Sequence, residues 1–100
     1  MIVRVTAEAT SLELADEFTE FKVVVDADCA DPAATLKANG AGLLDGDSAI
    51  IFSRWVEANA ADSGSAAWQS GFSRMLAYAG TKGWLTEDDA GIKAHIERRP

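Results

Sequence analysis

The single histidine of the chain is the residue type best suited to acid–base chemistry. His95 lies in residues 92–97, where apolar and polar residues alternate. An imidazole exchanges its proton near neutral pH. Glu97, on the same side of an extended strand, could orient the ring and raise its pKa. His95 is therefore the one catalytic candidate, and a solvated strand face with alternating charges is the competing interpretation.

Three tryptophans in 100 residues are the second feature with chemical potential. Trp68 belongs to an apolar helix stripe. Trp55 and Trp84 stand at the expected ends of elements, where an indole can present an apolar face together with a polar N–H. We predict that a ligand pocket or partner surface, if one forms, lies where Trp55, Trp84 and His95 approach one another. The further candidates for lining it are Arg54, Arg74 and Tyr78.

The remaining constellations do not predict a metal or cofactor site. Carboxylates at Asp26, Asp28 and Asp31 resemble the start of a calcium loop, but Asp31 stands where glycine is needed and Lys37 where the bidentate glutamate is needed. One cysteine and one histidine cannot form a recognisable zinc site. Acidic neighbours disfavour a thiolate at Cys29. We therefore expect no metal, no cofactor and no catalytic cysteine.

The charge is strongly asymmetric. The net charge is −7, and residues 1–50 hold ten acids and three bases, whereas residues 51–100 hold six of each. An acidic surface repels phosphate groups, so we expect neither nucleic acid nor an anionic membrane as partner. The acidic N-terminal region and the lack of a long apolar run argue against a leader or membrane span. One cysteine suits a reducing compartment, and the alanine-rich composition suggests a bacterial source, so we expect a cytoplasmic protein.

The elements that must position these residues centre on a helix at about 65–80. Its apolar residues fall on one face with helical spacing, and Ser63 or Ser65 can cap its start. These apolar residues are Trp68, Phe72, Met75, Leu76 and Ala79. Gly80 or Gly83 can supply the left-handed residue that ends the helix.

Strands are indicated by alternating or β-branched segments at residues 2–8, 20–26 and 48–52. In the second of these, Phe21, Val23 and Val25 should face the core. Two segments each fit two kinds of secondary structure. Residues 11–18 fit a short helix capped by Ser11 or a strand arm. Residues 86–97 fit a final strand, which the period-2 pattern favours, or a C-terminal helix.

Two shorter helices complete the pattern. Asp31 suits an N-cap, Pro32 the first helical position and Gly40 the C-terminal left-handed position. A second short helix should follow residues 48–52, with Ser53 as its cap. We predict one α+β domain over residues 1–100, with a frayed tail at 98–100. Its fold would be a two-layer sandwich with two to three helices packed on one face of a three- to four-stranded, mostly antiparallel sheet.

These sequence features indicate broad classes of function and no particular activity. The leading hypothesis is a small non-catalytic accessory or protein-interaction module that self-associates, so a protein partner or homodimer is expected. The alternative is a small enzyme or ligand-binding protein with an aromatic pocket, in which His95 is the acid–base group and an arginine binds an anionic small molecule.

Overall fold

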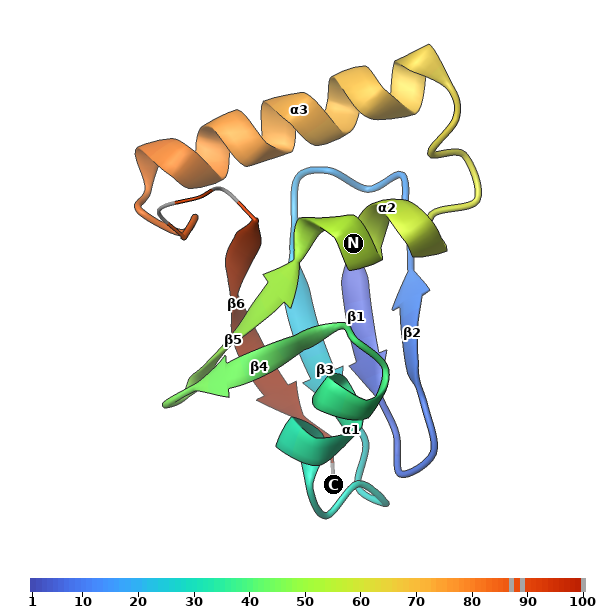
Figure 1. The fold of residues 1–100 in the computed structure, drawn as a ribbon, viewed down its shortest axis with the longest axis vertical. Helices are drawn as coiled ribbons and strands as arrows, with labels where there is room; N and C mark the ends of the chain where they lie inside the picture. Colours follow the sequence, from blue (N-terminus) through green and yellow to red (C-terminus); the bar gives the residue numbers. More distant parts are fainter. Residues whose placement is uncertain (87, 89, 100) are drawn as a thin grey trace.

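The computed structural model describes residues 1–86, 88 and 90–99, and in this part of the chain it contains six strands and three helices (Figure 1). The strands are β1 (Ile2–Val5), β2 (Thr10–Glu13), β3 (Lys22–Val25), β4 (Gly42–Asp45), β5 (Ser48–Phe52) and β6 (Gly91–Arg98). The helices are α1 (Pro32–Ala38), α2 (Ser53–Asn59) and α3 (Ala66–Thr81). None of the helices in the described ranges has both the length and the hydrophobicity needed to cross a membrane.

The strands form one mixed sheet in the order β2-β1-β3-β6-β5-β4, which curls into a half-barrel. The β1–β3 and β3–β6 pairs are parallel, and the other pairs are antiparallel. The prediction of a three- to four-stranded, mostly antiparallel sheet was therefore wrong. The two edge strands account for the difference in number: β2 lies mostly in the segment that fits either a helix or a strand arm, and no strand was predicted at the four residues of β4.

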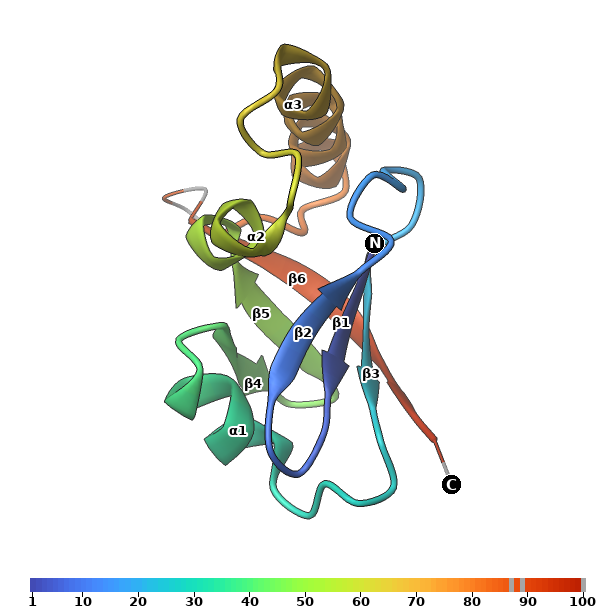
Figure 2. The ribbon, with the colours of Figure 1, turned by 90° about the vertical axis from the view of Figure 1, so that its right-hand side faces the viewer.

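The helices were predicted to pack on one face of the sheet, but the structure does not place all three there. In Figure 2, α1 and α2 lie on the inner side of the curl, whereas α3 crosses one end of it and no described helix lies on the outer side. Because successive strand residues point to opposite faces, alternate residues of the sheet fill the inner side. Val3, Val23, Ala49 and Ile51 are fully buried there with Leu36 of α1 and Val56 of α2.

Val24 points to the outer side but is fully buried as well. In the sheet register it lies between Arg4 and Glu97. The long aliphatic stem of an arginine can cover apolar surface while its charged head stays in water. The outer face is thus closed by charged side chains in place of a helix.

Sequence signals placed α1 correctly. Asp31 is the N-cap, its Oδ1 accepting a hydrogen bond from the Ala34 N–H at 3.1 Å, and Pro32 opens the helix. Gly40 follows with a φ of 66°, a left-handed conformation that suits glycine. Gly46, at φ 61°, makes the tight turn between β4 and β5. The predicted strand followed by a short helix is also confirmed. Ser53 is not its cap, however: Phe52 occupies the N-cap position without a side-chain hydrogen bond, and the Ser53 hydroxyl donates to the Ala90 carbonyl.

Helix α3 starts and packs as predicted. Ser65 accepts a hydrogen bond from the Trp68 N–H at 3.0 Å, and the stripe Trp68, Phe72, Met75 and Ala79 is buried. The helix is anchored on the loop between β2 and β3. Trp68 Nε1 donates to the Ala15 carbonyl at 2.8 Å, and Phe18 meets the Trp68 ring edge-on at 5.9 Å.

The C-terminal segment is a strand, so the helical alternative was wrong. In β6, Ile92 and Ala94 are buried, and Lys93 and His95 are exposed. Arg98 ends this strand, and the Arg99 N–H donates to the Val25 carbonyl at 2.9 Å. Of the tail predicted for residues 98–100, Pro100 lies outside the described residues.

Candidate functional site

The structure separates the candidate residues into two places. Arg54 and Trp55 of α2 line a hollow of about 500 Å³, which we call the α2 pocket. Arg74, Tyr78, Trp84 and His95 line three adjoining hollows elsewhere, which we call the aromatic groove. The expected meeting of Trp55 with Trp84 and His95 does not occur within one hollow.

The aromatic groove consists of three hollows that adjoin one another through shared lining residues. The first, of about 440 Å³, shares Phe18, Tyr78 and Met75 with a middle hollow of about 70 Å³. The middle hollow shares Phe21, Trp84 and Lys93 with the third, of about 230 Å³. Arg74 stands at the first end of the groove, and Ser48 and His95 stand at the other.

Tyr78 and Trp84 form the centre of the groove. Their rings meet edge-to-face at 6.0 Å, and the Lys82 Nζ lies 5.6 Å from the centroid of the Tyr78 ring. Both side chains remain accessible, at 58% and 43% exposure. Trp84 is fixed through its backbone: its N–H donates to the Ala79 carbonyl of α3, and its carbonyl accepts from the Lys93 N–H of β6.

The far end of the groove is built on the outer face of the sheet. His95 is paired with Ser48 of β5 on one side and Lys22 of β3 on the other. The expected partner of the imidazole is engaged elsewhere, because the Glu97 carboxylate lies 3.3 Å from the Lys22 Nζ. Hydrogen bonds that Lys22 donates to Glu20 and, to a smaller extent, to Glu97 raise the pKa of Lys22. The acid–base role of His95 stays a prediction.

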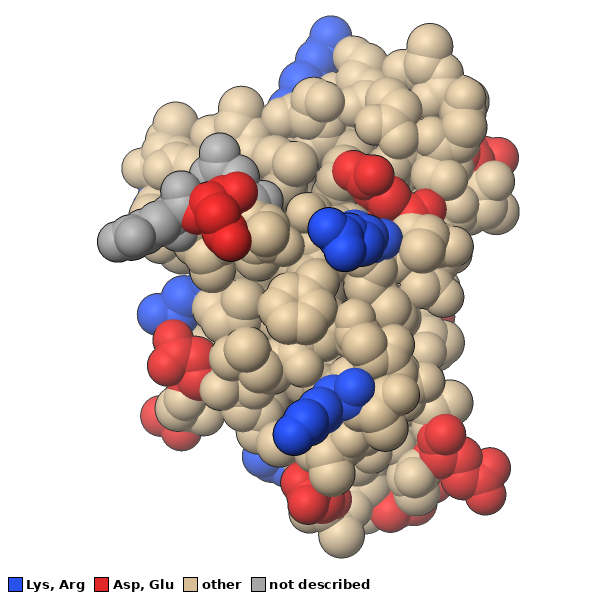
Figure 3. Space-filling model, in the orientation of Figure 1, with Lys and Arg blue, Asp and Glu red and all other residues tan. Residues whose placement is uncertain are grey.

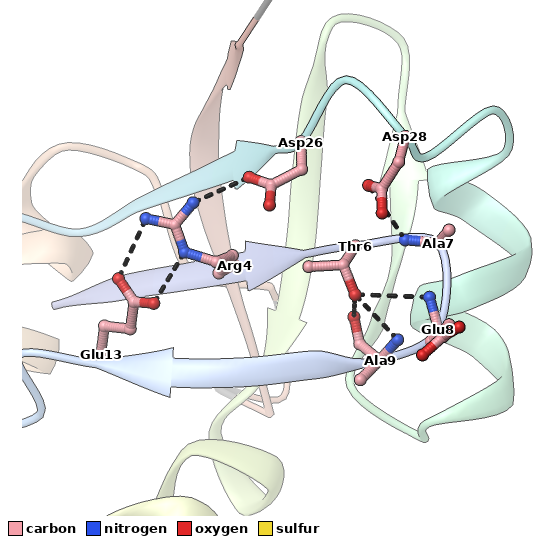
Figure 4. A network of polar contacts seen from close by, with 8 residues as sticks. All are labelled: Arg4, Thr6, Ala7, Glu8, Ala9, Glu13, Asp26 and Asp28. Carbon is pink, nitrogen blue, oxygen red and sulfur yellow. Dashed lines mark hydrogen bonds and ion pairs between the residues drawn. The ribbon is translucent and has the colours of Figure 1, made fainter.

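The outer face also carries a network of paired charges around Arg4 (Figure 4). Its guanidinium binds both carboxylate oxygens of Glu13, at 2.7 and 3.1 Å, and Asp26 at 2.7 Å. Such two-pronged pairing fixes geometry as well as charge. Hydrogen bonds from Arg4 lower the pKa of Glu13, and those to Glu13 and Asp26 raise the pKa of Arg4. These residues are satisfied by one another and stabilise the junction of three strands.

The cations at the groove, unlike Arg4, are not paired with a carboxylate of the described residues. Among residues 1–86, 88 and 90–99, Arg74, Lys82 and Lys93 have no carboxylate oxygen within 4.0 Å. The acid that lines the middle hollow, Glu20, is itself 3.0 Å from Lys22. Three cations without a carboxylate partner among the described residues therefore lie at the groove, although the chain as a whole carries −7.

Acidic residues in and beside the loop before α1 make structural hydrogen bonds. Asp28 accepts a hydrogen bond from the Ala7 N–H, and Asp31 caps α1. Cys29 is buried, with its Sγ 3.8 Å from the Thr35 hydroxyl. In the described part of the chain, no three His, Cys, Asp or Glu side chains come together as ligands for a metal ion.

Sequence reasoning missed Phe18, Phe21 and Lys93 as groove residues. Phe18 was placed in an uncertain element, Phe21 was assigned to the core, and Lys93 looked like an ordinary solvated strand residue. Their proximity comes from the parallel β3–β6 pairing, which no local pattern indicates. No protein-family model, curated protein or solved structure matches the chain.

Proposed function

We propose that the protein is a small interaction module whose aromatic groove binds a segment of a protein partner. The segment would be apolar or aromatic along its body and would carry carboxylates. The observation that carries this proposal is a set of adjoining hollows lined by accessible aromatic side chains, with cations beside them in an otherwise acidic chain.

Two physical terms support binding in this groove. Accessible tyrosine, tryptophan and arginine side chains are the residues that most often dominate protein interfaces, at about 2 kcal/mol or more each when truncated. Here Tyr78, Trp84 and Arg74 occupy one surface. Cations on the rim attract an acidic partner and set its direction, and their effect weakens with salt.

The same groove supports the expected self-association. A second copy presents an acidic first half, with exposed carboxylates such as Asp16, Asp28 and Asp31. A homodimer and a heterologous partner would then compete for one surface. Light scattering on the eluate of a size-exclusion column, at low and high salt, measures the extent of self-association.

A designed peptide pair tests the groove. One peptide alternates leucine or tryptophan with glutamate, and its control replaces every glutamate by lysine. We expect the acidic peptide to bind and to shift the amide signals of Tyr78, Trp84 and Lys93 in a two-dimensional NMR spectrum. Equal binding of the lysine peptide would contradict the proposal.

Variants of the protein then locate the binding. Trp84→Ser should weaken binding at least tenfold, and Lys93→Glu should weaken it and remove most of its salt dependence. Leu43→Ser is the matched control, since Leu43 is a similarly exposed apolar residue, at 47%, on β4. Binding reduced as much by Leu43→Ser as by Trp84→Ser would show that the groove is not the site.

A further inference from the structure

The α2 pocket is separate from the aromatic groove and has a different shape and lining. It holds about 500 Å³, within the range of small-molecule sites. Its walls come from three distant parts of the chain: Gly40, which follows the C-cap of α1, the β5–α2 junction, and Ala90, which precedes β6. The lining residues are Gly40, Phe52, Ser53, Arg54, Trp55, Ala58 and Ala90.

These walls are tied to one another by main-chain hydrogen bonds. The Phe52 N–H donates to the Ala41 carbonyl at 2.8 Å, which fixes the chain beside Gly40. The Ser53 N–H donates to the Ala90 carbonyl at 2.9 Å, and the Ser53 hydroxyl donates to the same oxygen. A pocket held in this way needs little reordering when a ligand enters, which favours binding.

The lining combines an apolar body with one cation. Phe52 and Trp55 supply aromatic surface, Trp55 being 8% exposed and thus rigidly packed. Arg54 is exposed, and no carboxylate oxygen of the described residues lies within 4.0 Å of its guanidinium. In Figure 3 a basic group and adjoining acidic groups lie over the region of α2, and most of the surface below them is uncharged.

We infer that the α2 pocket binds a small molecule with a flat apolar body and a single carboxylate. The ring system would lie against Phe52 and Trp55, and the carboxylate would accept hydrogen bonds from Arg54. A guanidinium matches a carboxylate with two parallel N–H donors, which sets the direction of the ligand in the pocket. Gly40 and Ala58 leave the space that the ring system fills.

The test uses 2-naphthoate as the probe and 2-naphthamide, its uncharged equivalent, as the matched ligand. Titrations are followed by NMR of the backbone amides. We expect naphthoate to shift the signals of Gly40, Arg54, Ala58 and Ala90 and to bind at least tenfold more tightly than the amide, because hydrogen bonds to charged groups are the stronger ones. Equal affinity of the two probes, no binding, or shifts confined to Tyr78 and Trp84 would overturn the inference.

Three variants distinguish a specific loss of ligand binding from a nonspecific effect of substitution. Arg54→Gln should reduce naphthoate affinity about tenfold and leave the affinity for the amide unchanged. Ala58→Phe should fill the pocket and abolish binding of both probes. Lys37→Gln removes an exposed cation outside the pocket and should change nothing. If Arg54→Gln and Lys37→Gln have the same effect, attraction by overall charge explains the binding and the site is refuted.

Discussion

Replacing Gly71 by alanine tests how α3 is held on the rest of the fold. A glycine inside a helix costs about 0.5–1 kcal/mol relative to alanine, so Gly71→Ala would stabilise a solvent-exposed helix. In this protein a Cβ at Gly71 would lie 2.4 Å from Cε2 and 2.6 Å from Cδ2 of the Phe18 ring. The absence of a side chain therefore lets the ring pack directly on the helix.

Whether Gly71→Ala stabilises or destabilises the protein depends on the balance between the gain in helix propensity and the cost of the clash with Phe18. Carbon atoms in contact normally lie about 3.5–4.0 Å apart, so the ring must retreat by about 1 Å. The ring also contacts Trp68, which lies three residues before Gly71 on α3. Overpacking of this kind costs about 1–3 kcal/mol, which exceeds the gain in helix propensity. We expect a net loss of about 1 kcal/mol, equivalent to a fall in Tm of about 4–8 °C for a chain of this size.

Two further variants isolate the cause. Gly80→Ala is the matched control, because its Cβ would meet only Leu85 Cδ1, at an ordinary 3.6 Å; this change should raise stability, measured by urea unfolding. In a Phe18→Ala background the clash is gone, so Gly71→Ala should become stabilising by about 0.5–1 kcal/mol. If Gly71→Ala stabilises the unaltered protein as Gly80→Ala does, Phe18 does not pack on α3 as described.

Other changes have expected outcomes of their own. Trp68→Phe keeps an aromatic ring but removes the donor to the Ala15 carbonyl, and should cost about 1–3 kcal/mol in thermal melts; a neutral result would contradict the anchoring of α3. Asp31→Ala removes the cap of α1 and should cost about 1 kcal/mol, whereas Asp31→Asn should cost little. Because Arg4 lowers the pKa of Glu13, the stability from this pair is present above the ordinary carboxyl pKa and lost as pH falls through the lowered value. Urea unfolding should therefore show a gap between the unaltered protein and Glu13→Gln at pH 7 that narrows below about pH 4; a constant gap would mean that the ion pair is not its source.

The local elements were determined by the sequence to a large extent. Helix α3 could be predicted because its apolar residues repeat with helical spacing behind a serine cap, and α1 because an aspartate, a proline and a glycine stand at its ends. The strands β3, β5 and β6 were equally visible in runs of β-branched or alternating residues. Each of these signals acts over a few neighbouring residues, so no distant contact is needed to produce it.

The sheet order and the sites were decided by tertiary structure alone. The parallel pairing of β3 with β6 joins residues more than 70 positions apart, and its register is set by which side chains fill the inner side of the curl. The edge strand β4, with the sequence Gly-Leu-Leu-Asp, contains neither β-branched residues nor an alternation of apolar and polar residues. The sequence alone indicates that Trp55, Trp84 and His95 are residue types suited to a site. Long-range packing decides that they line two separate hollows.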